Sequence, residues 1–598
     1  MKTLKKIAFS LITLLTAGQA VGANTSTAVD QVTSAVTVAN DVDYHITGTV
    51  PFTADGSIDI TATDHAVLIF DNVKPSKLLA YLKYIKINGA AAVNNSTCQV
   101  KIYNRGSILL PYSKDIKPLT VYSGTNFTGT AVNDFGLEHN GGFMNTLTEA
   151  KLNNKIRSFK LKRGYMVTFS TRAGGYGYNR CFIADNEDLE FAEMPAILDR
   201  SISSYRIFKW NDAGKKGLAN DTRSESNNAL GSTWCYSFGL GEDTGIDREC
   251  VPHHIYEGWP AIADCAKTNY TTSSPTMKTN NEPGNSADDH PQSVATVLAN
   301  WEQHMATGMR LCSPSSHDGS LGWLKEFMDS IDARGWRCDV LDVHSYWPSG
   351  SFYGLSGWYD KYHRPIWISE WCWGASWNRN GVFNPSLSDA DAMSQNAAMV
   401  KELCELMDGY DFIERYSFWN SEADRSKLYL NGQLTEAGKN YAALEGKVGY
   451  NRKYDYVPRI PKAKGAPYNL SCVYDAAKGV SVLRWHEKNG EYNKSMTIER
   501  RETGKPWQTL VEIDLEEDEA DYMYEDTETF YGAEYRVHVV YADGKDYYTA
   551  KTAKAVPASL AAGDAVSIDG NIYYIGGNIL PNGDFDFGTM GWTNGEGG

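Results

Sequence analysis

The sequence lacks several features that define other classes of protein. The 598-residue chain has no apolar run long enough to cross a membrane stably, and this includes the apolar run near its start. Cysteine is sparse, with 10 residues, and no Cys-x-x-Cys or Cys/His spacing of the kind that binds zinc occurs. Lys and Arg number 57 against 73 Asp and Glu, for a net charge of −16. Because nucleic-acid binding needs clustered cations, we do not expect a nucleic-acid partner. The lack of a long apolar run means that we do not expect a membrane span either.

The few cysteines are spread thinly through a large, aromatic-rich chain. Several lie inside expected strands or helices, such as Cys312 and Cys404, where buried free thiols are the simpler interpretation. One or two disulfides remain possible, Cys98 with Cys181 among them. Pairing cannot be deduced from the sequence alone.

The first residues have the pattern of an export signal. Lys2, Lys5 and Lys6 precede the apolar run 7–15, and Val21-Gly22-Ala23 fits a cleavage site. No cysteine lies near that point, so a lipid-anchored form is not expected. We predict that residues 1–23 are a signal peptide and that the protein is exported to the periplasm, the cell surface or the medium.

Aromatic residues, in contrast, are abundant, with 16 Trp and 36 Tyr. Most aromatic side chains in proteins belong to the core. In an acidic exported protein they also suggest stacking on sugar rings, whose C–H faces are apolar.

The chain is too long for one hydrophobic core, so several domains are expected. Short β-like runs over residues 24–196 predict an all-β sandwich, either a carbohydrate-binding module or a structural prefix. Residues 197–448 alternate strands with amphipathic helices, and a linker over 449–465 follows. Residues 466–556 return to period two; an early Trp and a late Tyr-x-Val resemble a fibronectin type III module. Residues 557–598 resemble the start of a further carbohydrate-binding β-sandwich, apparently truncated.

The central region has the size and pattern of a (β/α)8 TIM-type barrel. Helical spacing of apolar residues separates its expected strands, as at Val294, Leu298, Trp301 and Met305. The eight expected strands are residues 216–219, 232–237, 251–256, 276–279, 309–313, 340–344, 365–369 and 413–419. We therefore predict a multidomain chain in which an α/β barrel is flanked by all-β sandwich modules.

Two glutamates end strands on opposite sides of this predicted barrel. Functional groups gather at the carboxyl ends of barrel strands, and Glu282 ends the fourth strand while Glu370 ends the seventh. Each glutamate alone is more simply a solvated or ion-paired loop residue. Together, they fit retaining glycoside hydrolysis, in which two carboxyl groups about 5–5.5 Å apart act as acid/base and nucleophile. We assign Glu282 as acid/base and Glu370 as nucleophile, with no cofactor and no metal required.

Other candidates follow from their place at strand ends. Trp419 ends the eighth strand and is expected to be a sugar platform rather than a core residue. Tyr346 is expected to hydrogen-bond Glu370, and His344 either binds sugar hydroxyls or is structural. Further candidates for lining sugar subsites are Trp234, Tyr236, Trp347, Trp371 and Trp373.

The order of motifs in this region resembles glycoside hydrolase family 128, a family of clan A β-1,3-glucanases. The motifs that carry the resemblance are Lys215-Lys216-Gly217-Leu218-Ala219, Trp234-x-Tyr236, Val251-Pro252, Asn281-Glu282-Pro283, Ser313-Pro314, Asp342-Val343-His344-Ser345-Tyr346, Pro365-Ile366-Trp367-Ile368-Ser369-Glu370 and Trp419. The resemblance covers residues 205–445. It implies a β-1,3-glucan substrate such as laminarin or curdlan, and a hydrogen bond from Asn281 to the sugar 2-OH.

The sequence departs from the family pattern at two places. His253-His254-Ile255-Tyr256-Glu257 follows Val251-Pro252, and residues 346–358 form a loop rich in Ser, Gly and aromatics. Subsite layout and endo or exo action therefore stay open. Two alternatives also stay open: a clan A enzyme for another β-glycan, and a non-catalytic glycan-binding surface protein. The oligomeric state is not indicated.

Overall fold

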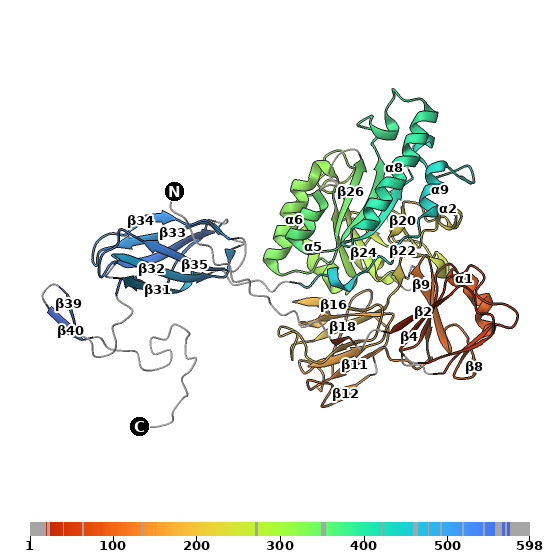
Figure 1. Ribbon diagram of the computed structural model, residues 1–598, viewed down its shortest axis with the longest axis horizontal. Coiled ribbons are helices and arrows are strands. Elements are labelled where there is room, and N and C mark those ends of the chain that lie inside the picture. Colours follow the sequence, from red (N-terminus) through yellow and green to blue (C-terminus); the bar gives the residue numbers. More distant parts are fainter. Residues whose placement is uncertain are drawn as a thin grey trace. The chain divides into compact units, whose positions relative to one another are not determined.

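The structure of the protein is a computed structural model (Figure 1). It describes residues 19–20, 24–556, 565–568 and 571–574, except residues 40, 62–64, 134, 150, 270–272, 348–353, 421–422, 459–464, 476–477, 491–492, 517–519 and 542–543. Two compact units divide the chain at Pro461 and Lys462, and each is described by itself. Most of the predicted signal segment lies outside the described residues, although Gln19–Ala20 (β1) pairs with the strand Leu189–Phe191 (β17).

The first β region, up to Pro111, differs from an antiparallel sandwich because successive strands alternate between two parallel sheets. β2 (Thr25–Val29), β4 (Val42–Ile46) and β6 (Val67–Phe70) pair in parallel. The intervening strands β3 (Ala35–Val38), β5 (Ser57–Ile60) and β7 (Ile85–Ile87) form a second parallel sheet, so the chain alternates between sheets. Strand spacing predicts the β runs but not this pairing, because parallel and antiparallel strands share the same two-residue period.

The second β region is an antiparallel pair of sheets. One contains β11 (Leu119–Tyr122), β14 (Ser158–Leu161) and β17, and the other contains β15 (Tyr165–Ser170), β16 (Asn179–Ala184) and β18 (Ser204–Lys209). Between them pack Phe159, Phe169, Phe182 and Phe191. β18 falls within residues 197–448, the region predicted as the barrel, but it pairs with β15, so this β region continues to Lys209 rather than ending at residue 196.

The central region contains two parallel sheets. The larger has the order β22 (Glu249–Val251), β21 (Trp234–Tyr236), β20 (Lys216–Ala219), β28 (Ile413–Trp419), β27 (Ile366–Trp373) and β26 (Leu341–Trp347). The smaller contains β23 (His253–His254), β24 (Thr276–Asn281) and β25 (Arg310–Ser315).

The two sheets are connected at both junctions. Pro252, which cannot donate a ladder hydrogen bond, separates β22 from β23, and its carbonyl accepts a hydrogen bond from the Lys278 amide. Parallel bridges join Cys312 to Val340 and Ser316 to Val343. Spatial neighbours thus follow chain order, while one continuous closed barrel remains a prediction.

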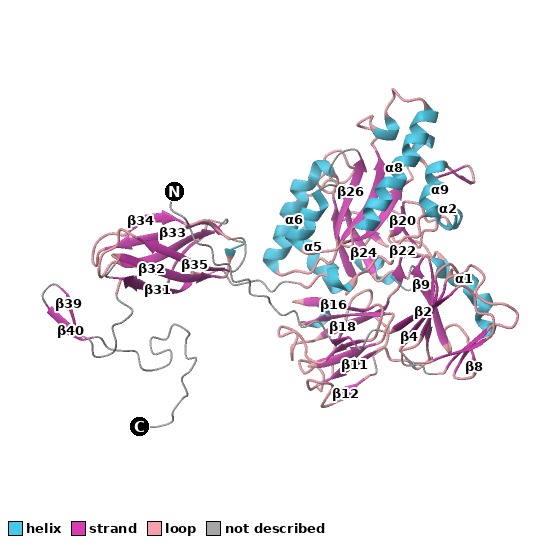
Figure 2. Ribbon diagram, in the orientation of Figure 1, coloured by secondary structure: helices cyan, strands magenta, loops and turns pink. Residues whose placement is uncertain are grey.

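Amphipathic helices cover the outside of these strands (Figure 2). Three of them are α5 (Val294–Ala306), α6 (Leu321–Arg334) and α8 (Asp389–Gly409), and α5 contains the four apolar residues whose spacing predicted a helix. Their apolar faces bury Trp301, Phe327 and Val400 in the largest core of the described chain. No described helix is both long and apolar enough to cross a membrane.

The interior of the strands carries charged and aromatic layers. Arg310 makes two hydrogen bonds to Glu414 at 2.5 and 2.7 Å, and Arg415 makes two to Glu249 at 3.0 and 3.2 Å. Beside them Trp234 and Trp367 lie with ring centroids 5.2 Å apart. A Cβ on Gly217 would come within 2.3 Å of the Trp234 ring, so this layer requires glycine there.

The second β region is fixed to the base of the central region by buried side chains. Arg206 donates to the carbonyls of Gly142, Ala266 and Thr307 at 2.7–3.0 Å. Arg337 donates to Asn179 Oδ1 at 2.5 Å, and Thr168 Oγ1 to the Gly308 carbonyl at 2.6 Å. These contacts place both parts in one unit, as the contact division at Pro461 also does.

The predicted linker begins as packed chain. Tyr450 and Tyr456 are buried, and Asp455 lies 3.7 Å from Arg310. Burying aromatic area outweighs the cost of ordering this stretch, so the packed domain extends to about residue 458.

The C-terminal unit is a β-sandwich. Its sheets comprise β31 (Tyr468–Asp475), β32 (Val480–Glu487) and β35 (Ala520–Asp526), and β33 (Asn493–Arg501), β34 (Gln508–Glu512), β36 (Glu534–Tyr541) and β37 (Asp546–Tyr548). Trp485 and Tyr535 lie in its core. The sandwich agrees with the expected alternation, and the fibronectin type III resemblance stays a prediction. Residues 578–586, which suggested another sandwich, lie outside the described residues.

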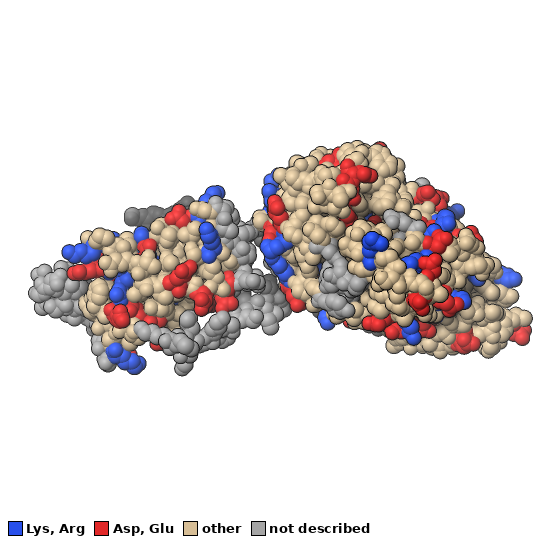
Figure 3. Space-filling model, turned by 90° about the horizontal axis from the view of Figure 1, so that it is seen from above, with Lys and Arg blue, Asp and Glu red and all other residues tan. Residues whose placement is uncertain are grey.

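All ten cysteines are free thiols, and nine are buried. Cys98 and Cys181, the pair considered for a disulfide, belong to different hydrophobic cores. On the face seen in Figure 3, acidic and basic side chains are interspersed.

Candidate active site

Glu282 directly follows β24 in an unusual backbone conformation. Its φ is +39°, in the left-handed region that non-glycine residues rarely adopt. The Asn285 amide holds the turn by donating to the Glu282 carbonyl at 2.8 Å, and Asn285 Nδ2 donates to Glu282 Oε2 at 2.7 Å. Such a conformation costs on the order of 1–3 kcal/mol and persists where the surroundings enforce it, often at functional sites.

Glu370 lies at an irregularity in β27. Val343 pairs with Ile368, but the next residue, His344, pairs with Glu370, so one extra residue enters β27. A bulge of this kind redirects side chains. Here Ser369 and Glu370 both point to the polar interior, and Trp371 then points to the helix-covered side.

The two glutamates meet across a histidine. His344 Nδ1 lies 2.7 Å from Glu282 Oε1 and 3.3 Å from Glu370 Oε2. One atom from each of the three side chains lies within 4.8 Å of the others. An oxygen of Glu282 and an oxygen of Glu370 are thus no more than 4.8 Å apart, which is compatible with the roughly 5–5.5 Å between the carboxyl groups of a retaining glycosidase pair. The same three atoms are near enough to bind a metal ion, although His344 Nδ1 is already hydrogen-bonded.

Charge is shared unequally in this group. Burial alone would raise the pKa of Glu282, but the hydrogen bond and charge of His344, with the bond from Asn285, lower it to about 2. Burial would lower the pKa of His344, but the two carboxylates raise it above its ordinary value of 6.5. Both shifts favour a proton on His344 over one on Glu282. This differs from the expectation that Glu282 itself is the protonated member.

Two tyrosines hold Glu370. Tyr236 donates to Glu370 Oε1 at 2.7 Å, and Tyr346 donates to Glu370 Oε2. Burial and the neighbouring Glu370 raise the pKa of both phenols well above 10, so both remain donors. The predicted contact of Tyr346 is present. Tyr236, expected to line a sugar subsite, instead orients the carboxylate.

Asn281 and Trp419 lie at strand ends as predicted. Asn281 Nδ2 donates to Asp288 Oδ2 at 3.2 Å, while its buried Oδ1 has no partner among the described residues. Trp419 is half-buried beside Phe238, with ring centroids 6.0 Å apart. The Oδ1 atom of Asn281 and the exposed part of the Trp419 ring are therefore available to a ligand.

Two predicted subsite residues are core residues instead. Trp234 is fully buried one layer below Tyr236, and its Nε1 donates to the Lys215 carbonyl at 3.0 Å. Trp371 is fully buried against Phe418, because the bulge before it reverses the side-chain alternation. Neither can stack on a sugar in this structure. Trp373 is half-buried against the same core, and the side chain of Trp347 lies outside the described residues.

The sequence interpretation missed several residues at the site. Trp377 is 61% exposed, and its ring centroid lies 4.8 Å from that of Tyr346. Its position a few residues after the seventh expected strand was the available signal. Asn285, three residues after Glu282, was missed because its contact depends on the left-handed turn.

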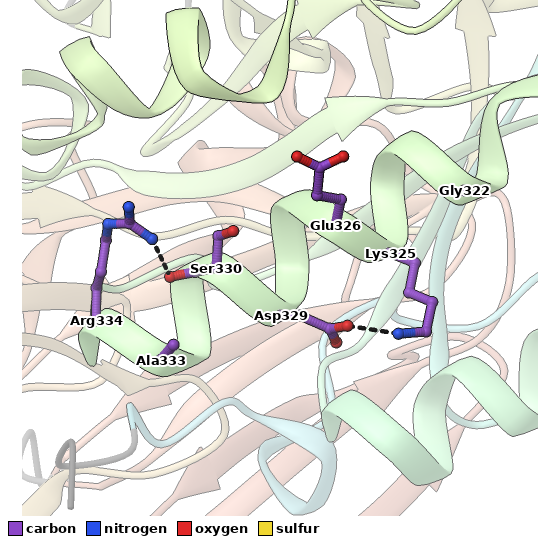
Figure 4. A pocket seen from close by; sticks show the side chains of 7 residues that line it. All are labelled: Gly322, Lys325, Glu326, Asp329, Ser330, Ala333 and Arg334. Atoms are coloured by element: carbon purple, nitrogen blue, oxygen red, sulfur yellow. Dashed lines mark hydrogen bonds and ion pairs between the residues drawn. The ribbon is translucent and has the colours of Figure 1, made fainter. Parts of the chain in front are cut away.

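A surface hollow along α6 lies outside this group (Figure 4). One helix supplies all of its lining, and its charges pair locally, Lys325 with Asp329 at 2.5 Å and Arg334 with the Ser330 carbonyl at 2.9 Å. These contacts indicate a solvated helix face rather than a second site.

Comparisons with known proteins agree with a glycosidase core. A family model described as glycosyl hydrolase catalytic core matches residues 210–441, which include both glutamates. A search among curated proteins found no match.

Several solved structures are similar to part of the chain. One is an endo-β-1,3-glucanase of glycoside hydrolase family 128, subgroup I, from Amycolatopsis mediterranei with laminaripentaose (27% identity, 38% of this chain and 99% of that chain, TM-score 0.33). Another is a subgroup II endo-β-1,3-glucanase from Pseudomonas viridiflava (19% identity, 38% and 97%, TM-score 0.32). A third is a subgroup VII oligosaccharide-binding protein from Trichoderma gamsii (18% identity, 38% and 92%, TM-score 0.31).

Proposed function

We propose that residues 210–441 are the catalytic core of an exported, retaining β-1,3-glucanase of glycoside hydrolase family 128, built on a (β/α)8 barrel. The observation that carries this proposal is the meeting of Glu282 and Glu370 at His344, with their ligand atoms within 4.8 Å. The match to a glycosyl hydrolase catalytic core over the same residues supports it.

In the first step, Glu370 attacks the anomeric carbon while Glu282 protonates the leaving glycosidic oxygen. The C–O bond of the leaving sugar breaks as the bond to Glu370 forms. In the second step, Glu282 takes a proton from water, and the water oxygen displaces Glu370 from the anomeric carbon. Two inversions give net retention, and Glu282 regains the proton it gave up.

Because its pKa is lowered to about 2, Glu282 is ionised in the free protein and needs a proton before it can act as an acid. His344 supplies that proton. Its Nδ1 lies 2.7 Å from Glu282 Oε1, so one short transfer along this hydrogen bond makes Glu282 an acid. Displacement of water by the sugar favours the neutral forms of both partners, because separated charges cost more in a drier site. The pair Glu282–His344 therefore acts as one acid.

The substrate class comes from the motif resemblance at residues 205–445. β-1,3-Glucan is also the substrate class named for the Amycolatopsis and Pseudomonas proteins. The half-buried Trp419 and the exposed Trp377 offer apolar faces for sugar rings.

Product analysis on laminarin and curdlan tests this function. We expect soluble oligosaccharides whose newly formed reducing ends are initially β, as proton NMR would detect. Glu282→Gln and Glu370→Gln should abolish release while leaving the melting temperature within a few degrees. Hydrolysis of another glycan alone would reject the substrate, and initial α-anomers would reject the mechanism.

Non-catalytic glycan binding is the second candidate. The observation that favours it is the pKa of about 2 for Glu282, which by itself leaves no proton for an acid step. Binding of laminarihexaose without any product after prolonged incubation would support it over hydrolysis.

A further inference from the structure

A fully buried lysine lies below the two carboxylates. Lys278 Nζ contacts Asp342, Ser315 Oγ at 2.9 Å and Ser369 Oγ at 2.5 Å. Both charged side chains have no solvent exposure. The four residues come from the adjacent strands β24, β25, β26 and β27, so this cluster joins the strands that carry Glu282, His344 and Glu370.

Lys278 contacts two of the features that orient Glu370, the bulge in β27 and Tyr236. Ser369 is the extra residue of the β27 bulge, immediately before Glu370. Lys278 Nζ also lies 4.7 Å from the ring centroid of Tyr236, which donates to Glu370 Oε1 at 2.7 Å. A cation over a phenol ring draws electron density from it and strengthens its O–H as a donor.

Stability alone does not explain a charge pair in this position. Removing two ions from water costs several kcal/mol each, and replacing a buried pair with apolar residues of similar size is often neutral or stabilising. Here the pair is imperfectly satisfied as well, since the buried Asp342 Oδ1 has no partner among the described residues. A role at the adjacent site accounts for a pair that the fold does not need.

We propose that Lys278, held by Asp342, is a positioning residue for the nucleophile: its ammonium fixes Glu370 through Ser369 and Tyr236, and its charge acts on His344. The expected kinetic consequences of this inference rest on the proposed function. The expected effect of the Lys278 charge on the pKa of His344 does not depend on any substrate. The described hydrogen bonds of Lys278 Nζ go to Asp342, Ser315 and Ser369, and none goes to Glu282 or Glu370.

The charge relations give the sign of the effect on His344. The charge of Lys278 lowers the pKa of His344. The carboxylates of Glu370 and Glu282 raise the same pKa, and their effect is larger. Removing the cation should therefore raise that pKa. The titratable groups facing Lys278 or His344 are Tyr236, His253, Glu282, Cys312, Asp342 and Glu370.

The kinetic test replaces the whole pair. In Lys278→Met/Asp342→Leu, we expect a melting temperature equal to or above that of the wild type, with kcat on laminarin reduced by about tenfold or more and KM changed by less than about twofold. The matched control is Arg415→Met/Glu249→Leu, a pair equally buried in the layer beside Trp367. This control should keep kcat within about twofold of wild type. Equal losses in both variants, or an unchanged kcat in the first, would overturn the proposal.

A smaller change covers the case in which the double variant does not fold. Ser369→Ala deletes one hydroxyl group, and it should lower kcat by about threefold or more without changing KM. An unchanged kcat in Ser369→Ala would contradict positioning through the bulge.

NMR titration of His344 in the full chain needs no substrate. We expect the His344 titration in Lys278→Gln to move to higher pH than in the wild type. No movement would reject the electrostatic part even if the protein hydrolyses no glucan. An inactive wild type with the expected movement would instead reject the proposed function alone.

Discussion

Nδ1 of His344 lies between Oε1 of Glu282, at 2.7 Å, and Oε2 of Glu370, at 3.3 Å. A single imidazole edge thus faces both carboxylates of the proposed reaction. The carboxylates raise the pKa of His344, and His344 lowers that of Glu282 to about 2. The two groups share one proton and titrate together.

This sharing predicts the alkaline side of the pH profile. His344 holds its proton below its raised pKa and loses it as the pH rises through that value, so kcat/KM should fall above a pKa higher than 6.5. In His344→Asn, Glu282 loses the cation that lowers its pKa and must supply its own proton. We expect the fall to move to lower pH and the maximal kcat/KM to drop by about 10²-fold. Rates on laminarin from about pH 4 to about pH 9 would check this, and an unmoved profile would contradict the shared proton.

Azide should distinguish the two glutamates. In Glu370→Ala the nucleophile is absent, so azide should attack an activated aryl β-glucoside directly and give the α-glycosyl azide. In Glu282→Ala the nucleophile remains, so azide should displace it in the second step and give the β-glycosyl azide. NMR of the products identifies the anomer. Reversed anomers would exchange the two assignments.

Tyr346→Phe tests the hydrogen bond to Glu370 without changing the size of the side chain. A hydrogen bond to a charged group contributes about 1.5–3 kcal/mol, so kcat/KM should fall by about 10- to 150-fold. Stability should change little, since the ring contact with Trp377 remains. Kinetics combined with a melting curve would measure both, and unchanged kinetics would mean that Tyr236 alone orients the carboxylate.

Trp371→Ala should lower stability, whereas Trp377→Ala should raise KM and leave stability nearly unchanged. Trp371 is fully buried, so its truncation should cost about 3–5 kcal/mol of unfolding free energy. Trp377 is mostly exposed, so its truncation should leave stability within about 0.5 kcal/mol and raise KM by about 2- to 10-fold. Denaturant unfolding and laminarin kinetics on both variants test the assignment of core and rim.

Arg337→Met should destabilise the large unit. Arg337 is buried and contacts Asn179, Asp339 and the Met309 carbonyl, so its loss leaves a buried carboxylate unpaired and should cost about 3–5 kcal/mol. Arg334→Met is the matched control three residues earlier, because Arg334 is exposed, hydrogen-bonds the Ser330 carbonyl and lies over the Trp336 ring, and has no described ion pair. Similar unfolding of both variants would mean that the Arg337 contacts contribute little.

Much of the site could be predicted because strand ends are visible in a sequence. The eighth expected strand, 413–419, coincides with β28, and Glu282 directly follows β24 as expected. Glu370 lies in the strand expected to carry it, but β27 continues for three residues beyond it, to Trp373. Apolar alternation and the turn at Asn281-Glu282-Pro283 were enough for that. The contact between Tyr346 and Glu370 followed from the same strand-end rule.

The errors came from features that strand periodicity cannot register. One bulged residue in β27 turns Trp371 from the mouth to the core, and nothing in the residues around Ser369 indicates it. Trp234 and Tyr236 share a face, but only three-dimensional layering decides which of them reaches Glu370. Likewise, the boundary predicted at residue 197 assigns β18 to the barrel region, whereas its pairing with β15 places it in the second β region.

The contacts of Arg206 have a consequence for how such chains arise by recombination. Its guanidinium, encoded ahead of residue 210, donates to carbonyls of residues 266 and 307. A gene crossover at residue 210 would transfer the following segment without Arg206. The carbonyls of residues 266 and 307 would then lose the hydrogen bonds that Arg206 donates. Successful exchange requires the second β region to travel with the strands that follow it, so the unit that evolution can move is longer than the stretch that carries the chemistry.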